Sequence, residues 1–107
     1  MVNFEPSNLF VNVTHYSLRH YNSWDTECLR NWLFEGSNDL KKWIIIHKHK
    51  KDGSLNGKGS TATWNVNSKG IRYKAFRIRQ DGKNSNKHWY LACSGIEFYG
   101  QIYLRQR

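Results

Sequence analysis

The chain has 107 residues, a formal net charge of +9, and aromatic side chains at 15% of its positions. One proline and 8 glycines argue against a fibrous or disordered chain, and this length predicts one domain spanning residues 1–107. The basic excess favours solubility and attracts polyanions or acidic proteins, but it does not decide the fold.

Apolar and polar residues alternate over most of the first segment, which is typical of a β-strand. The alternation over residues 9–18 changes phase around Thr14 and His15, which predicts a bulge or two short strands placed end to end. Residues 23–32 are the only stretch that suggests a helical turn, with Ser23 or Asp25 as its cap.

Residues 30–46 predict a hairpin, in which two apolar strands flank a polar turn. The run of apolar residues over 43–46 is continuous, as expected for a central strand covered on both faces. Further alternating segments follow at residues 62–66, 76–79 and 96–104. The residues expected in the core are Trp32, Phe34, Trp43, Ile45, Trp64, Phe76, Ile78 and Phe98.

The segments between these strands are rich in glycine, asparagine, aspartate and serine, which are turn-forming residues. Short strands separated by such loops predict an all-β antiparallel sandwich.

Several motifs in register resemble a known family. "WLFEGSNDLKKW", "YKAFRIRQDGKNS" and "LACSGIEFYG" resemble segments of the discoidin-like (coagulation factor 5/8 type C) domain. "THYSLRHYNSWDTECLRNW" and "SLNGKGSTATW" resemble its intracellular branch, which occurs in certain HECT-type ubiquitin ligases and BTB-domain adaptor proteins. The resemblance implies a jelly-roll sandwich of the galactose-binding type that serves binding rather than catalysis.

The chain departs from the family pattern at two points. Leu40 stands where glycine is usual in the hairpin turn. The match also begins partway into the family domain, so the chain is expected to be N-terminally short and to lack the first strand or strands.

Catalytic and metal-binding signatures are weak in this sequence, so we expect neither an enzyme nor a bound cofactor. His47 and His49 share a strand face, but no cysteine or acidic residue stands at a convincing spacing for a zinc site. Cys28 and Cys93 lie among apolar residues and outside any recognisable nucleophile signature.

If successive strands run antiparallel, the connections 21–29, 51–59 and 81–87 gather at one end of the sandwich. These are the longer loops, and binding residues of sandwich domains usually lie on such loops. The candidate ligand-binding residues are His20, Trp24, Asp25, Arg30, Ser54, Asn56, Asn84 and Ser85. The structural alternative is that Trp24 caps the core and the asparagines only form turns.

The function expected from these features is non-catalytic recognition of a protein partner within a ubiquitin-ligase-related or BTB-related protein. Two alternatives stay open: binding of a carbohydrate or other small polar ligand, and binding of nucleic acid or an anionic membrane through the basic surface. The chain starts without a secretory signal and contains no apolar run that could span a bilayer, which predicts an intracellular location.

Overall fold

The computed structural model describes residues 2–3, 9–21, 25–67, 69–89, 91 and 93–104. The strands are β1 (Val2–Asn3), β2 (Leu9–His20), β3 (Trp32–Ser37), β4 (Ile44–His49), β5 (Thr61–Asn65), β6 (Ala75–Gln80) and β7 (Cys93–Leu104). A helix that could span a membrane is not found among these residues. The helical turn expected over residues 23–32 is wrong for its described part, where Asp25 to Glu27 form bends without helix.

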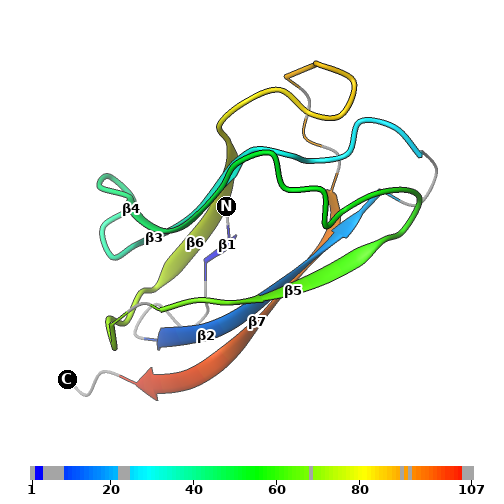
Figure 1. The fold of residues 1–107 in the computed structure, drawn as a ribbon. Helices are drawn as coiled ribbons and strands as arrows, with labels where there is room; N and C mark the ends of the chain where they lie inside the picture. Colours follow the sequence, from blue (N-terminus) through cyan, green and yellow to red (C-terminus); the bar gives the residue numbers. More distant parts are fainter. Residues whose placement is uncertain are drawn as a thin grey trace.

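The strands form two sheets that face each other (Figure 1). The four-stranded sheet has the order β1-β6-β3-β4 and the three-stranded sheet the order β5-β2-β7, and every pair of neighbours is antiparallel. The predicted all-β antiparallel sandwich is therefore confirmed. The phase change near Thr14 is also explained, because the pairing of β2 with β7 shifts register between Val13 and His15.

Aromatic rings from both sheets meet in the core. Phe34 on β3 stacks on Tyr16 of β2 with ring centroids 4.2 Å apart, and it also stacks on Phe76 of β6. Trp32, Phe34 and Phe76 are fully buried, as predicted. The predicted core residues Trp64, Ile78 and Phe98 pack against this cluster but are only partly buried. Truncating a buried Phe or Trp costs about 3–5 kcal/mol, so these rings dominate the stability of so small a domain.

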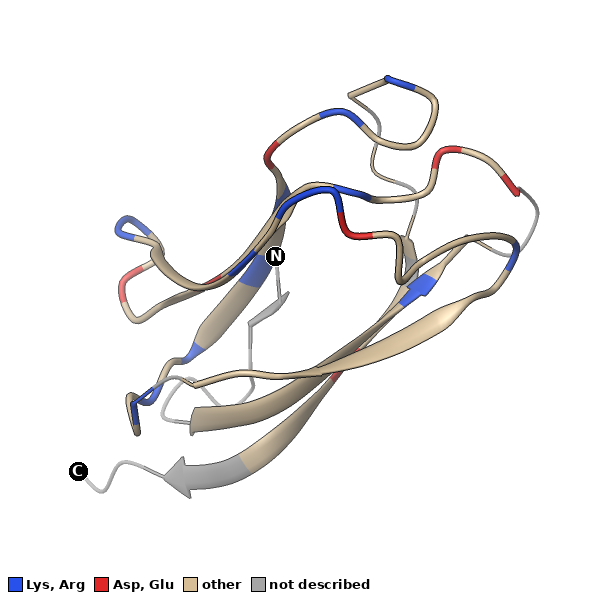
Figure 2. Cartoon of the chain, viewed as in Figure 1, with Lys and Arg blue, Asp and Glu red and all other residues tan. Residues whose placement is uncertain are grey.

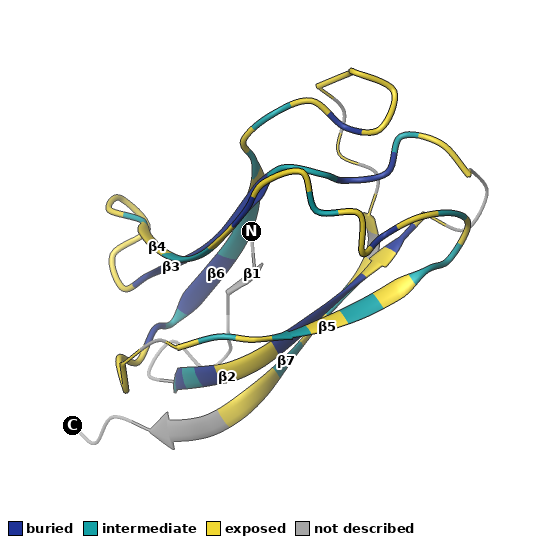
Figure 3. Ribbon diagram, in the orientation of Figure 1, coloured by how far each residue is buried: buried dark blue, intermediate teal, exposed yellow. Residues whose placement is uncertain are grey.

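The hairpin over residues 30–46 forms as β3 and β4, but the burial expected for its second strand is wrong. Figure 3 shows that β3 is buried along its length while much of β4 is exposed. Ile45 is 53% exposed, and Trp43 is half-buried. The reason is position: β4 is the last strand of the four-stranded sheet, paired with β3 alone among the described strands. A continuous apolar run does not distinguish a central strand from an edge strand.

The hairpin turn is held by its own side chains. The Ser37 hydroxyl accepts hydrogen bonds from the backbone N–H groups of Asp39 and Leu40, and the Asp39 carboxylate accepts two more, from Lys41 and Lys42. These hydrogen bonds lower the pKa of Asp39, and the bond from Lys42 has the largest effect. Leu40 lies at φ +62°, in the left-handed region that favours glycine.

Candidate functional site

Three connections meet at one end of the sandwich, namely β2–β3, β4–β5 and β6–β7, and we call this surface the loop end. The backbone N–H of Asp52 donates to the carbonyl of Arg30 at 2.9 Å, and that of Ser85 donates to the carbonyl of Cys28 at 2.9 Å. The β2–β3 connection thus lies between the other two (Figure 1). The structure brings together the same loops that the sequence places at one end.

Arg30 joins two of these connections. Its Nη1 donates to the Leu55 carbonyl at 2.7 Å, and its Nη2 donates to Oδ1 of Asn56 at 2.8 Å. Leu55 is buried, so the loop turns its one large apolar side chain inward and presents Asn56 to solvent. Both Arg30 and Asn56 are sequence-predicted site residues, and the structure places them in direct contact.

Two other predicted residues also reach across the loops, and a third, Ser54, bonds within its own loop. Oδ1 of Asp25 accepts a hydrogen bond from the Lys58 backbone N–H at 3.1 Å. The Ser85 hydroxyl accepts one from the Cys28 backbone N–H at 2.8 Å. Ser54 is exposed, and its backbone N–H and its hydroxyl both donate to the Asp52 carboxylate. Trp24 lies outside the described residues.

Glu27 organises the β6–β7 connection, a role that no sequence pattern indicated. Its carboxylate accepts hydrogen bonds from the side chains of Asn84, Asn86 and His88. These hydrogen bonds lower the pKa of Glu27, and the bond from Asn84 has the largest effect. Asn84 is buried and its Oδ1 also accepts the backbone N–H groups of Asn86 and His88, so its observed contacts hold the loop together.

Trp89 is a candidate that the sequence analysis missed. It is 65% exposed, the largest exposed fraction of any large hydrophobic side chain in the described ranges. Its neighbour His88 is fixed through its ring to Glu27 and through its carbonyl to the Asn84 N–H and the Gln80 side chain. A tryptophan that follows a held residue on a rigid sandwich has the character of an interface anchor. Its position directly after the loop, rather than within an alternating strand, was the available signal.

His20 and Cys28 lie beneath the loop end and are fully buried. The Cys28 Sγ lies 3.7 Å from Nε2 of His20, and it also accepts the Gly57 backbone N–H. Because neither side chain is exposed, a macromolecular partner cannot contact His20 directly, and the thiol is closed to a large substrate. This pair supports the loops from inside.

A second histidine network crosses the core. Trp32 Nε1 donates to the Tyr16 hydroxyl, which lies 2.6 Å from Nε2 of His49, and Nδ1 of His49 lies 2.8 Å from the Asp52 carboxylate. The spatial order of acid, imidazole and hydroxyl resembles that in a catalytic relay. However, the Tyr16 hydroxyl is fully buried, and its pKa is raised, chiefly by burial. The network is therefore structural. Within the described ranges, no group of three His, Cys, Asp or Glu residues is arranged to hold a metal ion.

Charge at the loop end is mixed. Four of the 8 acidic residues lie there, Asp25, Glu27, Asp52 and Asp81, and lysines lie on the β4–β5 and β6–β7 connections (Figure 2). A polyanion would meet these carboxylates wherever it contacted the loops, so the loop end is not a continuous basic surface.

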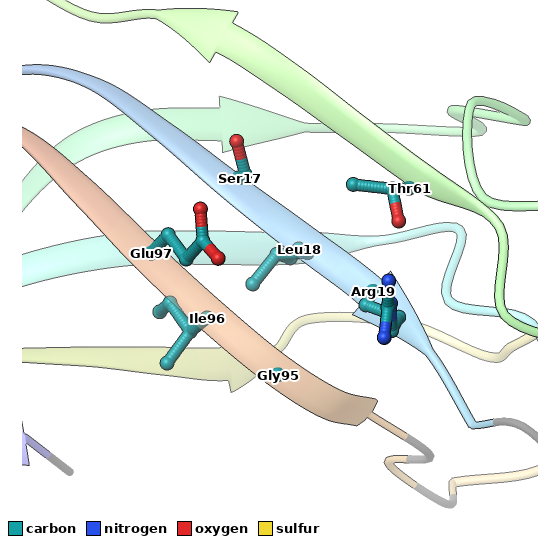
Figure 4. Close-up of a pocket in the computed structure, with 7 residues that line it drawn as sticks. All are labelled: Ser17, Leu18, Arg19, Thr61, Gly95, Ile96 and Glu97. Carbon is teal, nitrogen blue, oxygen red and sulfur yellow. The ribbon is translucent and has the colours of Figure 1, made fainter.

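A groove lies on the outer face of the three-stranded sheet, next to the strand ends that lead into the loop end (Figure 4). Its volume is about 220 Å³, and its lining residues are Ser17, Leu18, Arg19, Thr61, Gly95, Ile96 and Glu97. The lining contains no aromatic ring on which a sugar could stack. The groove therefore offers polar contacts without the usual platform for a carbohydrate.

Comparison with known proteins identifies relatives of the chain, which its geometry alone does not. No family model matches it. E3 ubiquitin-protein ligase hecd-1 of Caenorhabditis elegans is 49% identical over 96 residues, and E3 ubiquitin-protein ligase Ufd4 of Drosophila melanogaster is 40% identical over 98 residues. Each match covers 88% of this chain and 4% of the relative. The chain is therefore homologous to a short segment of these two ubiquitin ligases.

Proposed function

We propose that the chain is a non-catalytic protein-recognition domain of a ubiquitin-ligase-related protein, and that it binds its partner at the loop end. Its relatives are named as E3 ubiquitin-protein ligases, and the matched segment is a small part of each. A segment of this size serves a ligase best by selecting or positioning a protein. The discoidin-like resemblance supports the same role, and a ligase of this kind would place the domain inside the cell.

The observation that carries the proposal is the exposed Trp89 beside a loop that Glu27 holds in place. Interface energy concentrates in a few aromatic and arginine residues, and a held loop loses little entropy when a partner binds. The loop end also carries hydrogen-bonding groups, which belong to Arg30, Asn56, Asp25, Ser54 and Ser85.

Catalysis by the chain itself is disfavoured by the placement of its thiols. Cys28 is fully buried, and the exposed Cys93 directs its Sγ toward the Gly95 carbonyl. Among the described residues, neither arrangement supplies an exposed thiol with a neighbouring general base.

The test is capture of proteins from a eukaryotic cell lysate by the immobilised 107-residue chain, quantified by mass spectrometry. We expect one set of proteins to be lost when Trp89→Ser is used and retained with the matched control Tyr99→Ser. Tyr99 is also a large exposed aromatic residue, but it lies on β7 and is 47% exposed. Loss of a hot-spot tryptophan weakens binding roughly 30-fold or more.

Capture should change little when salt is raised from about 0.15 to 0.3 M, because a polyanion contact weakens steeply with salt and a hot-spot contact does not. If Trp89→Ser captures the same proteins as the parent chain, or if capture disappears with salt alone, the loop-end proposal is wrong.

A further inference from the structure

A second surface, distinct from the loop end, lies on the outer face of the four-stranded sheet. Strand pairing places two rows of side chains there. One row consists of Arg77, Glu35 and Ile45, and the next consists of Arg79, Leu33 and Lys48. We call these six residues the outer patch. Basic segments lie on β6 and near β4 in Figure 2.

Glu35 fixes both arginines of the outer patch. It is 2% exposed, and its Oε1 accepts the Nε–H of Arg77 at 2.9 Å and the Nε–H of Arg79 at 3.1 Å. The half-buried Trp43 adds a second restraint, since the Arg77 Cζ lies 4.2 Å from the centre of its ring. Because both Nε atoms bond to one oxygen, the two guanidinium groups lie side by side.

This arrangement leaves the terminal nitrogens of both guanidiniums available. In the described part of the chain, the Nη atoms of Arg77 and Arg79 make no hydrogen bond, and the two side chains are 31% and 51% exposed. A guanidinium held through Nε still presents a planar pair of donors that matches a carboxylate. The buried Glu35 neutralises one of the two charges, so the outer patch keeps a net positive charge.

Apolar surface adjoins these donors. Ile45 pairs with Glu35 in register and is 53% exposed. An exposed isoleucine beside preorganised arginines matches a ligand that carries both an acid and an apolar side chain.

We propose that the outer patch docks an extended acidic segment of a partner protein. One carboxylate of that segment binds Arg77 and Arg79 together, and an apolar side chain two residues away, on the same face of the extended segment, covers Ile45. Residues i and i+2 of an extended chain lie on one face, so the acidic and the apolar side chain of such a segment can both point at the outer patch, where Arg77 and Ile45 stand on opposite sides of Glu35. This docking does not depend on the loop end.

Charge selects this occupant over two others. Residues 41–51 contain five lysines and no acidic residue, so a second copy of the chain would bring like charges together. A nucleic acid would satisfy the arginines, but its phosphate backbone offers nothing apolar to the exposed Ile45.

The probe is a fluorescein-labelled nine-residue peptide in which two glutamates flank one leucine at every second position, with serine and glycine elsewhere. Its controls are a leucine-to-serine peptide, a glutamate-to-glutamine peptide and a short oligothymidine. Binding to the 107-residue chain is measured by fluorescence anisotropy. The variants are Arg77→Lys, Arg79→Lys and Ile45→Ser, with Arg19→Lys on the opposite sheet as the matched control.

We expect the glutamine peptide not to bind, and Arg77→Lys and Arg79→Lys to weaken binding about tenfold each through loss of charge-assisted hydrogen bonds. Ile45→Ser should weaken binding of the leucine peptide and leave binding of the serine peptide unchanged. This coupling also keeps the test decisive if an arginine variant is unstable, because Ile45 is exposed. Equal binding of the leucine peptide, the serine peptide and oligothymidine would overturn the proposal in favour of a non-specific polyanion surface. Absence of peptide binding, or an equal effect of Arg19→Lys, would also overturn it.

Discussion

The Tyr16 hydroxyl lies 2.6 Å from Nε2 of His49, and this contact fixes the protonation state of the imidazole. Trp32 Nε1 can only donate, so the Tyr16 oxygen accepts from it and the Tyr16 O–H donates to His49. Nε2 must then be unprotonated, and Nδ1–H donates to Asp52. The core therefore requires a neutral His49.

This requirement predicts loss of stability in mild acid. Burial lowers the pKa of His47 and of His49, partly opposed by Asp52, and the two rings lie 4.2 Å apart. A group with a lower pKa in the folded protein binds more protons when unfolded, so stability falls as pH falls. Stability should be complete above about pH 6.5, the usual histidine pKa, and should decrease progressively below it.

Urea unfolding between pH 7.5 and 5 measures this effect. His47→Gln should flatten the acid dependence, because it removes one of the two imidazoles whose pKa is lowered by burial. His15→Gln is the matched control, since His15 is exposed on β2 and should leave the dependence unchanged. A urea midpoint that does not move between pH 7.5 and 5 would contradict the prediction.

The same network predicts an unequal cost for removing two tyrosine hydroxyls. Tyr16→Phe leaves the buried Trp32 N–H and the His49 Nε2 without partners, which should cost about 1–3 kcal/mol of unfolding free energy. Tyr99→Phe removes only an exposed bond to Glu97 and should change stability by less than about 0.5 kcal/mol. Denaturant unfolding of both variants provides the comparison. Similar losses of unfolding free energy in the two variants would show that the hydrogen-bond network of Tyr16 does not stabilise the fold.

The hairpin turn offers a stabilising substitution. Leu40 adopts φ +62° and is 43% exposed, so Leu40→Gly relieves left-handed backbone strain of about 1–2 kcal/mol while losing little buried surface. The greater freedom of glycine in the unfolded chain offsets part of this gain. We expect the melting temperature to rise by a few degrees. Ile71→Gly is the matched control, because Ile71 is similarly exposed but lies outside the left-handed region, and it should give no increase.

The sequence predicted the fold well because period-two alternation and turn residues are local signals. It found the hairpin, the buried Trp32 and Phe34, and the register shift near Thr14. It did not place β4 at the sheet edge, since strand order depends on long-range pairing that apolar runs do not encode.

The candidate site was only partly predictable for a similar reason. Loop positions follow from strand alternation, so the meeting of the three connections could be expected. The burial of His20 and Asn84 and the carboxylate role of Glu27 depend on contacts between residues up to 61 positions apart. Trp89 was missed because it follows a turn and belongs to no alternating segment.

Glu27 links the architecture of the loop end to its proposed function. Its carboxylate holds the side chains of Asn84, Asn86 and His88, and thereby the backbone that leads to Trp89. Glu27→Ala should loosen this connection without disturbing the aromatic core. We expect faster amide exchange over residues 83–89 and faster trypsin cleavage after Lys83 and Lys87, with nearly unchanged exchange in β3.

The matched control is Glu97→Ala, which removes a carboxylate whose side-chain bond is to the exposed Tyr99. It should leave both measurements at parent values. If Trp89 is the anchor, Glu27→Ala should also weaken capture of the Trp89-dependent proteins, because the tryptophan must then be ordered at the moment of binding. Faster exchange with undiminished capture would show that Trp89 binds without a held loop. Unchanged exchange would show that the three hydrogen bonds do not restrain the connection in solution.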